Sequence, residues 1–225
     1  MKKLPMAALA AAASIAFTAP TWADTPTAVV EDVSGKVAGV EFMDYVSAGR
    51  VIRLGTQDTI VLGYLQSCWR EKITGGMVTV GTERSEVQGG KVERTQVKCG
   101  GGQIQLSAAQ AVQSAGVISR SLSTPRREDT AVQPQVTLYS RVPMIEVGSA
   151  GTLLIERIDE PDERFQIEIS SRELVRKSFF DFARARRVLA AGGLYRARMG
   201  SKQVVFKVDD AAPAAAPVVA RLLRF

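Results

Sequence analysis

Histidine is absent from the 225-residue sequence, and its absence removes several kinds of active site. Without an imidazole, no Ser-His-Asp or Cys-His pair can form, and the commonest metal ligand is missing. Cysteine occurs only twice and aromatic residues make up 6% of the chain. The phosphate-binding Gly-x-x-x-x-Gly-Lys-Ser/Thr loop, the Gly-x-Ser-x-Gly elbow and the Ser-x-x-Lys pair are also absent from the sequence. The sequence therefore predicts a non-enzymatic protein with no cofactor and no metal site.

Long apolar runs are also few, and the first of them has the layout of a secretory signal peptide. A basic start with Lys2 and Lys3 precedes an apolar segment over about residues 7–17, and small residues end at Ala23. The segment is too short for a membrane span, which takes about 20 residues, and later apolar runs are only as long as strands. We expect a mature chain from Asp24 that is periplasmic or secreted, as in a Gram-negative bacterium, with no later transmembrane segment.

Charges of both signs are mixed along the chain. The sequence has 29 Lys and Arg residues against 23 acidic ones, and removal of the signal peptide leaves 27 against 23, a net charge of +4. So small an excess, in an exported chain, does not predict a nucleic-acid partner. The densest basic stretch holds Arg184, Arg186 and Arg187. We expect either a solvated stretch there or a contact surface for an anionic lipid head group or an acidic polymer.

Short apolar runs separated by glycine predict a mainly β fold. In the first half they lie at residues 33–40, 50–54, 59–65, 77–80 and 102–106. Glycines punctuate these runs, and we expect a turn at Gly75-Gly76. Several runs are apolar at consecutive positions, so parts of the antiparallel sheet should be covered on both faces.

A helix-forming stretch and a polar linker follow this β region. Residues 107–116 contain good helix formers, and Ser107 with Gln110 fits a capping box, which predicts one short helix. Residues 120–135 are polar and contain two prolines, which is typical of a linker. The first predicted domain therefore covers residues 24–119 and ends in the short helix.

The second half returns to β patterns. Apolar residues recur or alternate along residues 136–142, 153–158, 165–169, 194–198 and 203–208. The last two runs predict a hairpin that turns at Gly200-Ser201. We expect a β-sandwich-like domain over residues 136–209, in which residues 179–182 form either a strand end or a short helix. Residues 210–225 are rich in Ala and Pro and predict a mobile, low-complexity tail.

The two cysteines allow three interpretations. A nucleophilic Cys68 would need its thiolate stabilised, and in the absence of histidine only Arg70 and Lys72 are close to it in sequence. A metal site needs more ligands than two cysteines 31 positions apart. Cysteines of an exported chain are expected to pair, so we predict a Cys68–Cys99 disulfide. Trp69 and Arg70 then remain as a possible contact surface.

One part of the first domain resembles a known family. The segments Gly35-Lys-Val, Ala48–Leu65 (AGRVIRLGTQDTIVLGYL) and Val78-Thr-Val-Gly resemble the FecR-type domain of bacterial envelope proteins. The resemblance covers residues 29–106 and departs from the family at Cys68-Trp69-Arg70, where many members have an Asp-Gly turn. It implies a β-rich exported module in signalling or surface regulation, without a catalytic site.

A second resemblance lies near the end of the second domain. The stretch Leu189-Ala-Ala-Gly-Gly-Leu-Tyr195 is similar to the tyrosine corner of immunoglobulin-like and fibronectin type III domains, in which a tyrosine hydroxyl bonds back to the backbone. The resemblance implies that Leu189 packs in the core and that Tyr195 makes the corner.

The sequence as a whole predicts two small antiparallel β modules joined by a short helix and a polar linker. We expect a non-enzymatic binding module in envelope sensing, signalling or assembly that engages a protein partner. The alternative is a protein that binds peptidoglycan or another surface polysaccharide. A third hypothesis is a glycosidase that works with carboxylates alone.

Overall fold

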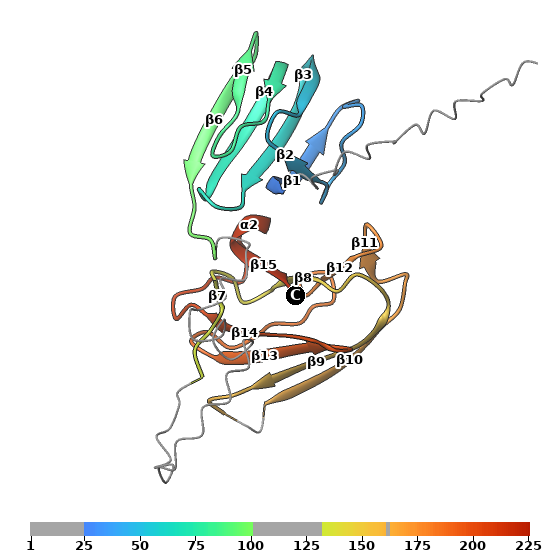
Figure 1. Cartoon of the computed structure of the whole chain (residues 1–225), viewed down its shortest axis with the longest axis vertical. Helices are drawn as coiled ribbons and strands as arrows, with labels where there is room; N and C mark the ends of the chain where they lie inside the picture. The colour runs from blue at the N-terminus through green and yellow to red at the C-terminus, as the bar shows by residue number, and fades with distance from the viewer. Residues whose placement is uncertain (1–24, 101–131, 161–162) are drawn as a thin grey trace, which may run out of the picture.

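The computed structural model describes residues 25–100, 132–160 and 163–225, which form two β modules stacked along the long axis of the molecule (Figure 1). The predicted signal peptide, the predicted helix in residues 107–116 and residues 120–131 of the predicted linker lie outside this range. No helix of the described part is long and apolar enough to cross a membrane.

The described chain is almost entirely β. The first module contains β1 (Pro26–Ser34), β2 (Tyr45–Ser47), β3 (Val51–Tyr64), β4 (Trp69–Thr79), β5 (Glu86–Gln88) and β6 (Lys91–Gln96). The second module contains β7 (Val136–Leu138), β8 (Met144–Glu146), β9 (Gly151–Arg157), β10 (Arg164–Ile169), β11 (Leu174–Val175), β12 (Phe179–Asp181), β13 (Leu194–Met199), β14 (Lys202–Val208), α2 (Val218–Arg221) and β15 (Leu222–Arg224). The predicted mainly β fold is confirmed.

The first module is a single antiparallel sheet in the order β2-β1-β3-β4-β5, with β6 also paired to β4. β3 joins two of the predicted strands into one strand of 14 residues. Its register with β4 shifts between Leu54 and Thr59, so the hairpin is irregular at that point. Apolar side chains from both parts of β3, such as Ile52 and Ile60, reach the same core.

Gly75 and Gly76 lie inside β4 and do not form the predicted turn. Their φ angles are 67° and 83°, in the left-handed region that favours glycine. A Cβ atom on Gly76 would lie 2.4 Å from the carbonyl oxygen of Gln88 and 2.6 Å from the nitrogen of Gly90. The two glycines therefore mark the point where β4 changes partner from β6 to β5.

The second module is a sandwich of two sheets. One sheet has the order β10-β9-β13-β14-β7 and the other has the order β11-β12-β8-β15. Side chains of both sheets, such as Ile155 and Phe180, share one apolar core. The β13–β14 hairpin turns at Gly200-Ser201 as predicted, with a positive φ at Gly200. β7 and β15 pair with their neighbours in parallel, which departs from the purely antiparallel prediction.

The C-terminal residues belong to the fold, so the predicted mobile tail is wrong for residues 218–225. α2 lies between the two modules, and β15 completes the second sheet by pairing with β8 (Figure 1). Val219, Leu222 and Leu223 are almost fully buried. The Ala/Pro-rich composition is confined to the segment before α2, and the apolar residues that follow it are what the fold buries.

Candidate functional site

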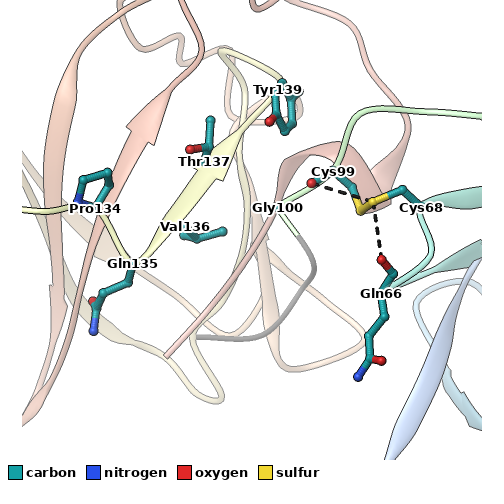
Figure 2. Close-up of a pocket in the computed structure, with 9 residues that line it drawn as sticks. All are labelled: Gln66, Cys68, Cys99, Gly100, Pro134, Gln135, Val136, Thr137 and Tyr139. Carbon is teal, nitrogen blue, oxygen red and sulfur yellow. Dashed lines mark hydrogen bonds between the residues drawn. A yellow bond between two sulfur atoms is a disulfide. The ribbon is translucent and has the colours of Figure 1, made fainter. Parts of the chain in front are cut away.

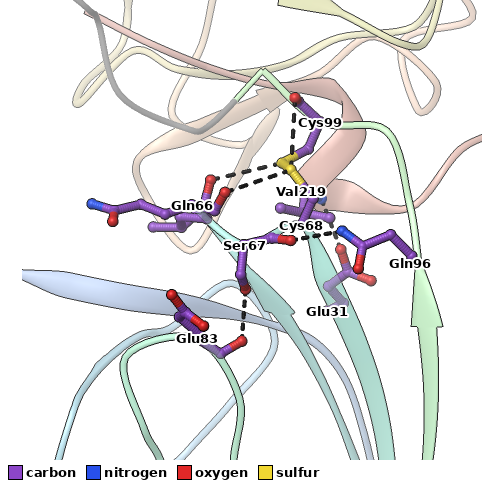
Figure 3. Close-up of a disulfide and its surroundings, with 9 residues drawn as sticks. Glu31, Gln66, Ser67, Cys68, Glu83, Gln96, Cys99 and Val219 are labelled. Carbon is purple, nitrogen blue, oxygen red and sulfur yellow. Dashed lines mark hydrogen bonds between the residues drawn. A yellow bond between two sulfur atoms is a disulfide. The ribbon is translucent and has the colours of Figure 1, made fainter.

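Cys68 and Cys99 meet at the end of the first module that faces the second (Figure 3). Their Sγ atoms lie 1.94 Å apart, at bonding distance, and their Cα atoms lie 5.6 Å apart, as predicted. The carbonyl oxygen of Cys68 also accepts a hydrogen bond from the N–H of Val97 (3.0 Å). The disulfide thus joins the turn between β3 and β4 to the segment that follows β6, and it leaves no thiol for the nucleophile interpretation.

The residues around Cys68 are occupied in holding this turn in place. The hydroxyl of Ser67 donates to the carbonyl oxygen of Glu83 (2.6 Å), and the side-chain amide of Gln96 donates to the carbonyl oxygen of Ser67 (2.7 Å; Figure 3). Trp69 is half-buried against the core of the first module. Arg70 pairs with Glu31, with Nε 2.7 Å from the carboxylate. Both residues of the predicted contact surface are therefore already engaged within the molecule.

Glu71, next along β4, is fully buried in a polar network. Its carboxylate accepts hydrogen bonds from Arg94 Nε (2.6 Å) and from the N–H of Ser85 (3.0 Å). The hydroxyls of Ser85 and Tyr64 lie 2.8 Å apart. Burial raises the pKa of Tyr64 to about 12. This network connects β3, β4 and β6 inside the first module, so Glu71 has a structural partner for each carboxylate oxygen.

The junction between the modules is a third apolar core, shared by both. The sheet β11-β12-β8-β15 has two buried faces, so its side chains alternate between cores. Ile145, Phe180 and Leu223 point into the sandwich. Their chain neighbours Met144, Phe179 and Leu222 point instead toward the first module, where they join Val29, Met43 and Leu65.

Glu31 anchors the C-terminal segment at the centre of this junction. The register of β1 against β3 shifts between Val30 and Asp32, so Glu31 is the extra residue of a β-bulge. Its side chain is only 2% exposed, and it accepts hydrogen bonds from Arg70 and from the N–H of Val219 in α2 (2.7 Å). A Cβ atom on Gly63 would lie 2.6 Å from Glu31 Oε1 and 2.9 Å from Val219 Cβ, so only glycine leaves room for this contact.

Polar contacts surround the shared core. The Tyr45 hydroxyl donates to Glu146 (2.8 Å), and Arg224 Nε contacts the same carboxylate (3.1 Å). Burial, followed by the charge of Glu146, raises the pKa of Tyr45.

At another point on the rim, Arg176 pairs with Glu41 and with Asp44 of the first module, 2.7 Å from Asp44. Sequence reasoning identified none of these rim residues. A signal at the junction was Glu31, an acid that directly follows the apolar residues Ala28, Val29 and Val30 of β1.

A cavity of about 360 Å³ lies beside the disulfide between the two modules (Figure 2). Gln66 and the cystine line one side, and the β7 segment with Gln135, Thr137 and Tyr139 lines the other. Among the described residues that line it, none carries a formal charge. Its polar groups can therefore hydrogen-bond a neutral molecule, but they do not form a pair of catalytic carboxylates.

Residues 179–181 form the strand β12, and not the short helix that was the alternative. The predicted basic stretch follows this strand. Arg184, Arg186 and Arg187 are all exposed. The chain forms one helical turn here and ends it with Arg186 in the left-handed region, at φ 53°. These three arginines thus lie on one loop of the second module, whereas Trp69 and Arg70 lie at the start of β4 in the first module.

Leu189 and Tyr195 occupy the positions that the second resemblance implies. Leu189 is 1% exposed in the sandwich core. The Tyr195 hydroxyl accepts a hydrogen bond from the N–H of Ala190 (2.9 Å) and contacts Glu163 (3.2 Å). Burial raises the pKa of Tyr195 to about 12. The hydroxyl of Tyr195 thus bonds to the backbone of the same chain segment, five residues earlier.

Comparisons with known proteins assign no family to the chain. No protein-family model, no curated protein and no solved structure matches it.

Proposed function

We propose that the protein is a non-enzymatic, exported binding module that engages a protein partner in envelope sensing, signalling or assembly. The observation that carries this proposal is the shared core between the modules, which fixes two small β units as one body. A rigid body presents its loops in a fixed arrangement, and this lowers the entropy lost on binding. The resemblance of residues 29–106 to FecR-type domains is in keeping with such a role.

The proposal of a non-enzymatic role has support from the acidic residues. Glu31, Glu71 and Asp181 are the buried carboxylates of the described chain. Each is ion-paired with an arginine: Arg70, Arg94 and Arg221 in turn. A glycosidase needs two carboxylates that face the substrate, one of them with a raised pKa. These three instead hold strands and the C-terminal segment together.

Export is proposed on two features. The first 23 residues have the layout of a signal peptide. The cysteines lie at disulfide distance, and such bonds persist in oxidising compartments. Cell fractionation of the full-length protein and of a form without residues 2–23 tests this, because only the former should reach the periplasm or medium.

Crosslinking in intact cells, followed by affinity capture and mass spectrometry, tests the protein-partner function. The expected result is one envelope protein that crosslinks reproducibly to the wild-type chain. A parallel assay measures co-sedimentation of the purified protein with peptidoglycan sacculi. Sedimentation with sacculi, in the absence of any crosslinked protein, would overturn the proposal.

That second outcome would support polysaccharide binding, which one observation favours. The cavity beside the disulfide is lined by uncharged hydrogen-bonding groups, as neutral sugar hydroxyls require. Replacing Thr137 by Val removes one of these groups and should then weaken sacculus binding.

A further inference from the structure

The loop after β12 carries an unusual concentration of exposed positive charge. Arg184, Arg186 and Arg187 lie on it, and Arg172 lies opposite, because Arg172 and Arg184 line the same cavity of about 190 Å³. We call these four residues the arginine surface. Glu173 is the one exposed acid of this cavity, and it is already engaged by the Ser170 hydroxyl (2.7 Å) and N–H (2.9 Å).

The four guanidinium groups differ from most arginines of the molecule. Within the described part of the chain, none of the four has a hydrogen-bond or ion-pair partner. Asp181, which also lines the cavity, is occupied by Arg221 at 2.8 Å. Ser170, and to a lesser extent Arg187, lowers the pKa of the Glu173 carboxyl. The surface therefore has four positive charges and a single acid that is already hydrogen-bonded.

The backbone of the loop shows that arginine occupies a position that favours glycine. The N–H of Arg187 bonds to the carbonyl of Phe182 (2.9 Å), and the N–H of Arg186 bonds to that of Ala183 (3.2 Å). This is the Schellman arrangement, in which the left-handed residue is usually glycine. Arg186 has φ 53° there. Keeping arginine at this position costs stability relative to glycine, and we take this as support for a use of the side chain.

The chemistry of the surface favours an acidic peptide over a sugar polymer. All four cations are arginines, whose planar forks bind carboxylates in bidentate fashion. Val188, which follows Arg187, is 46% exposed and is one of three large apolar side chains exposed in the described residues, all of them valines. Arginine beside an exposed apolar residue is typical of protein interfaces. A sugar ring would instead need an exposed aromatic face, and none of the exposed large hydrophobic residues is aromatic.

We propose that Arg172, Arg184, Arg186 and Arg187 form the docking surface for an acidic segment of the protein partner, with Val188 contacting an apolar residue of that segment. This inference rests on the proposed function and adds to it where the partner binds and what charge it carries. Each arginine pairs with a carboxylate of the segment, so affinity should fall as salt screens the charges.

Fluorescence anisotropy with the full mature chain tests the proposal. The probe is a fluorescein-labelled peptide of Glu, Asp and Leu, and the control peptide has Gln and Asn in place of the acids. We expect binding of the acidic peptide only, and a loss of about tenfold or more in the Arg184→Glu/Arg187→Glu variant. The matched variant Arg53→Glu/Arg84→Glu makes the same charge change at two exposed arginines of the first module and should bind as the wild type does.

Arg186→Gly separates binding from folding. The substitution relieves the left-handed backbone strain, so the urea midpoint should hold or rise while peptide affinity falls several-fold. Unchanged affinity in this variant and in Arg184→Glu/Arg187→Glu would overturn the proposal. An equal loss in the Arg53→Glu/Arg84→Glu control would also overturn it, because it would show an effect of net charge alone.

Two further ligands test other partners of the same surface. Phosphatidylglycerol vesicles and polygalacturonate present anionic lipid and anionic sugar. Binding to either one through these arginines, without binding to the acidic peptide, would overturn the assignment. The crosslinking experiment separates the proposed function from the proposed docking surface. If the wild type and Arg184→Glu/Arg187→Glu capture the same protein equally, the chain has a protein partner, but that partner does not bind at the arginine surface.

Discussion

Arginine has opposite roles in two regions of the molecule. At the junction between the modules, Arg70, Arg176 and Arg221 are each paired with a carboxylate, and Arg221 is only 9% exposed. On the loop after β12, Arg184 and Arg186 are exposed and pair with no described residue. Arg176 pairs across the two modules, and Arg70 and Arg221 each pair within one module, whereas the unpaired charges remain free to contact another molecule. Position relative to carboxylates, and not residue type, separates the two roles.

The largest expected change comes from removing the disulfide beside the junction. Cys68→Ser/Cys99→Ser should lower the free energy of unfolding by about 3 to 4 kcal/mol, because the chain-entropy model gives that value for a loop of this length. Urea unfolding with and without reductant measures the difference. Reductant should affect only the wild type, and an equal effect on the Ser variant would contradict the assignment. Non-reducing digestion and mass spectrometry should find the Cys68–Cys99 peptide pair.

Glu31→Ala tests the paired charges of the junction directly. The substitution leaves the N–H of Val219 buried without an acceptor and removes the partner of Arg70. We expect a loss of about 3 kcal/mol in the free energy of unfolding. Glu86→Ala, at an exposed site of the same sheet, should change stability by no more than about 0.5 kcal/mol. Equal effects of the two substitutions would show that Glu31 does not anchor the C-terminal segment.

The buried tyrosines predict a loss of stability at alkaline pH. Burial raises the pKa of Tyr64 and Tyr195 to about 12, and that of Tyr45 is also raised. Below pH of about 10 both the folded and the unfolded states hold the proton, so the contribution is complete.

Above that pH the unfolded chain loses its protons first, and stability falls as pH rises toward 12, by up to about 1.4 kcal/mol per pH unit for each tyrosine. Urea midpoints measured across this range should show the decline. Tyr45→Phe should make the decline shallower, because the junction loses one of its titrating groups. A curve that stays flat above pH of about 10 would contradict the burial of these hydroxyls.

The smallest expected change in stability tests the contrast between paired and unpaired arginines most directly. Arg186→Gly should raise the free energy of unfolding by about 0.5 to 1 kcal/mol, because a left-handed residue becomes glycine and no ion pair is lost. Arg176 is also left-handed, at φ 50°, but it pairs with Glu41 and Asp44. Arg176→Gly should therefore gain less or lose stability. Thermal unfolding of both variants measures this difference, and equal gains would show that the junction ion pairs contribute nothing.

Local patterns in the sequence predicted the features that depend on nearby residues. Alternating apolar residues identified the strands of the sheet β10-β9-β13-β14-β7, and Gly200-Ser201 identified its hairpin turn, because both depend on neighbours in the chain. The same patterns did not identify the other sheet, β11-β12-β8-β15. The oxidising-compartment argument identified Cys68 with Cys99. The Gly75-Gly76 prediction was wrong because positive φ angles occur at a change of strand partner as well as at a turn.

The junction could not be predicted, because its contacts are between residues far apart in the chain. Glu31 contacts the N–H of Val219 across 188 positions, and Tyr45 contacts Glu146 across 101. The C-terminal residues were assigned to a tail from the composition of the segment before them. No short-range pattern shows that Leu222 and Leu223 enter two different cores.

The sequence by itself determined the β character of the chain, the pairing of its two cysteines and the absence of imidazole chemistry. These follow from composition and from periodicity over a few residues. Only the tertiary structure decided which charges are neutralised and which stay exposed, because an ion pair depends on distances that chain folding sets. The same residue type therefore stabilises the junction at Arg221 and remains available for binding at Arg184.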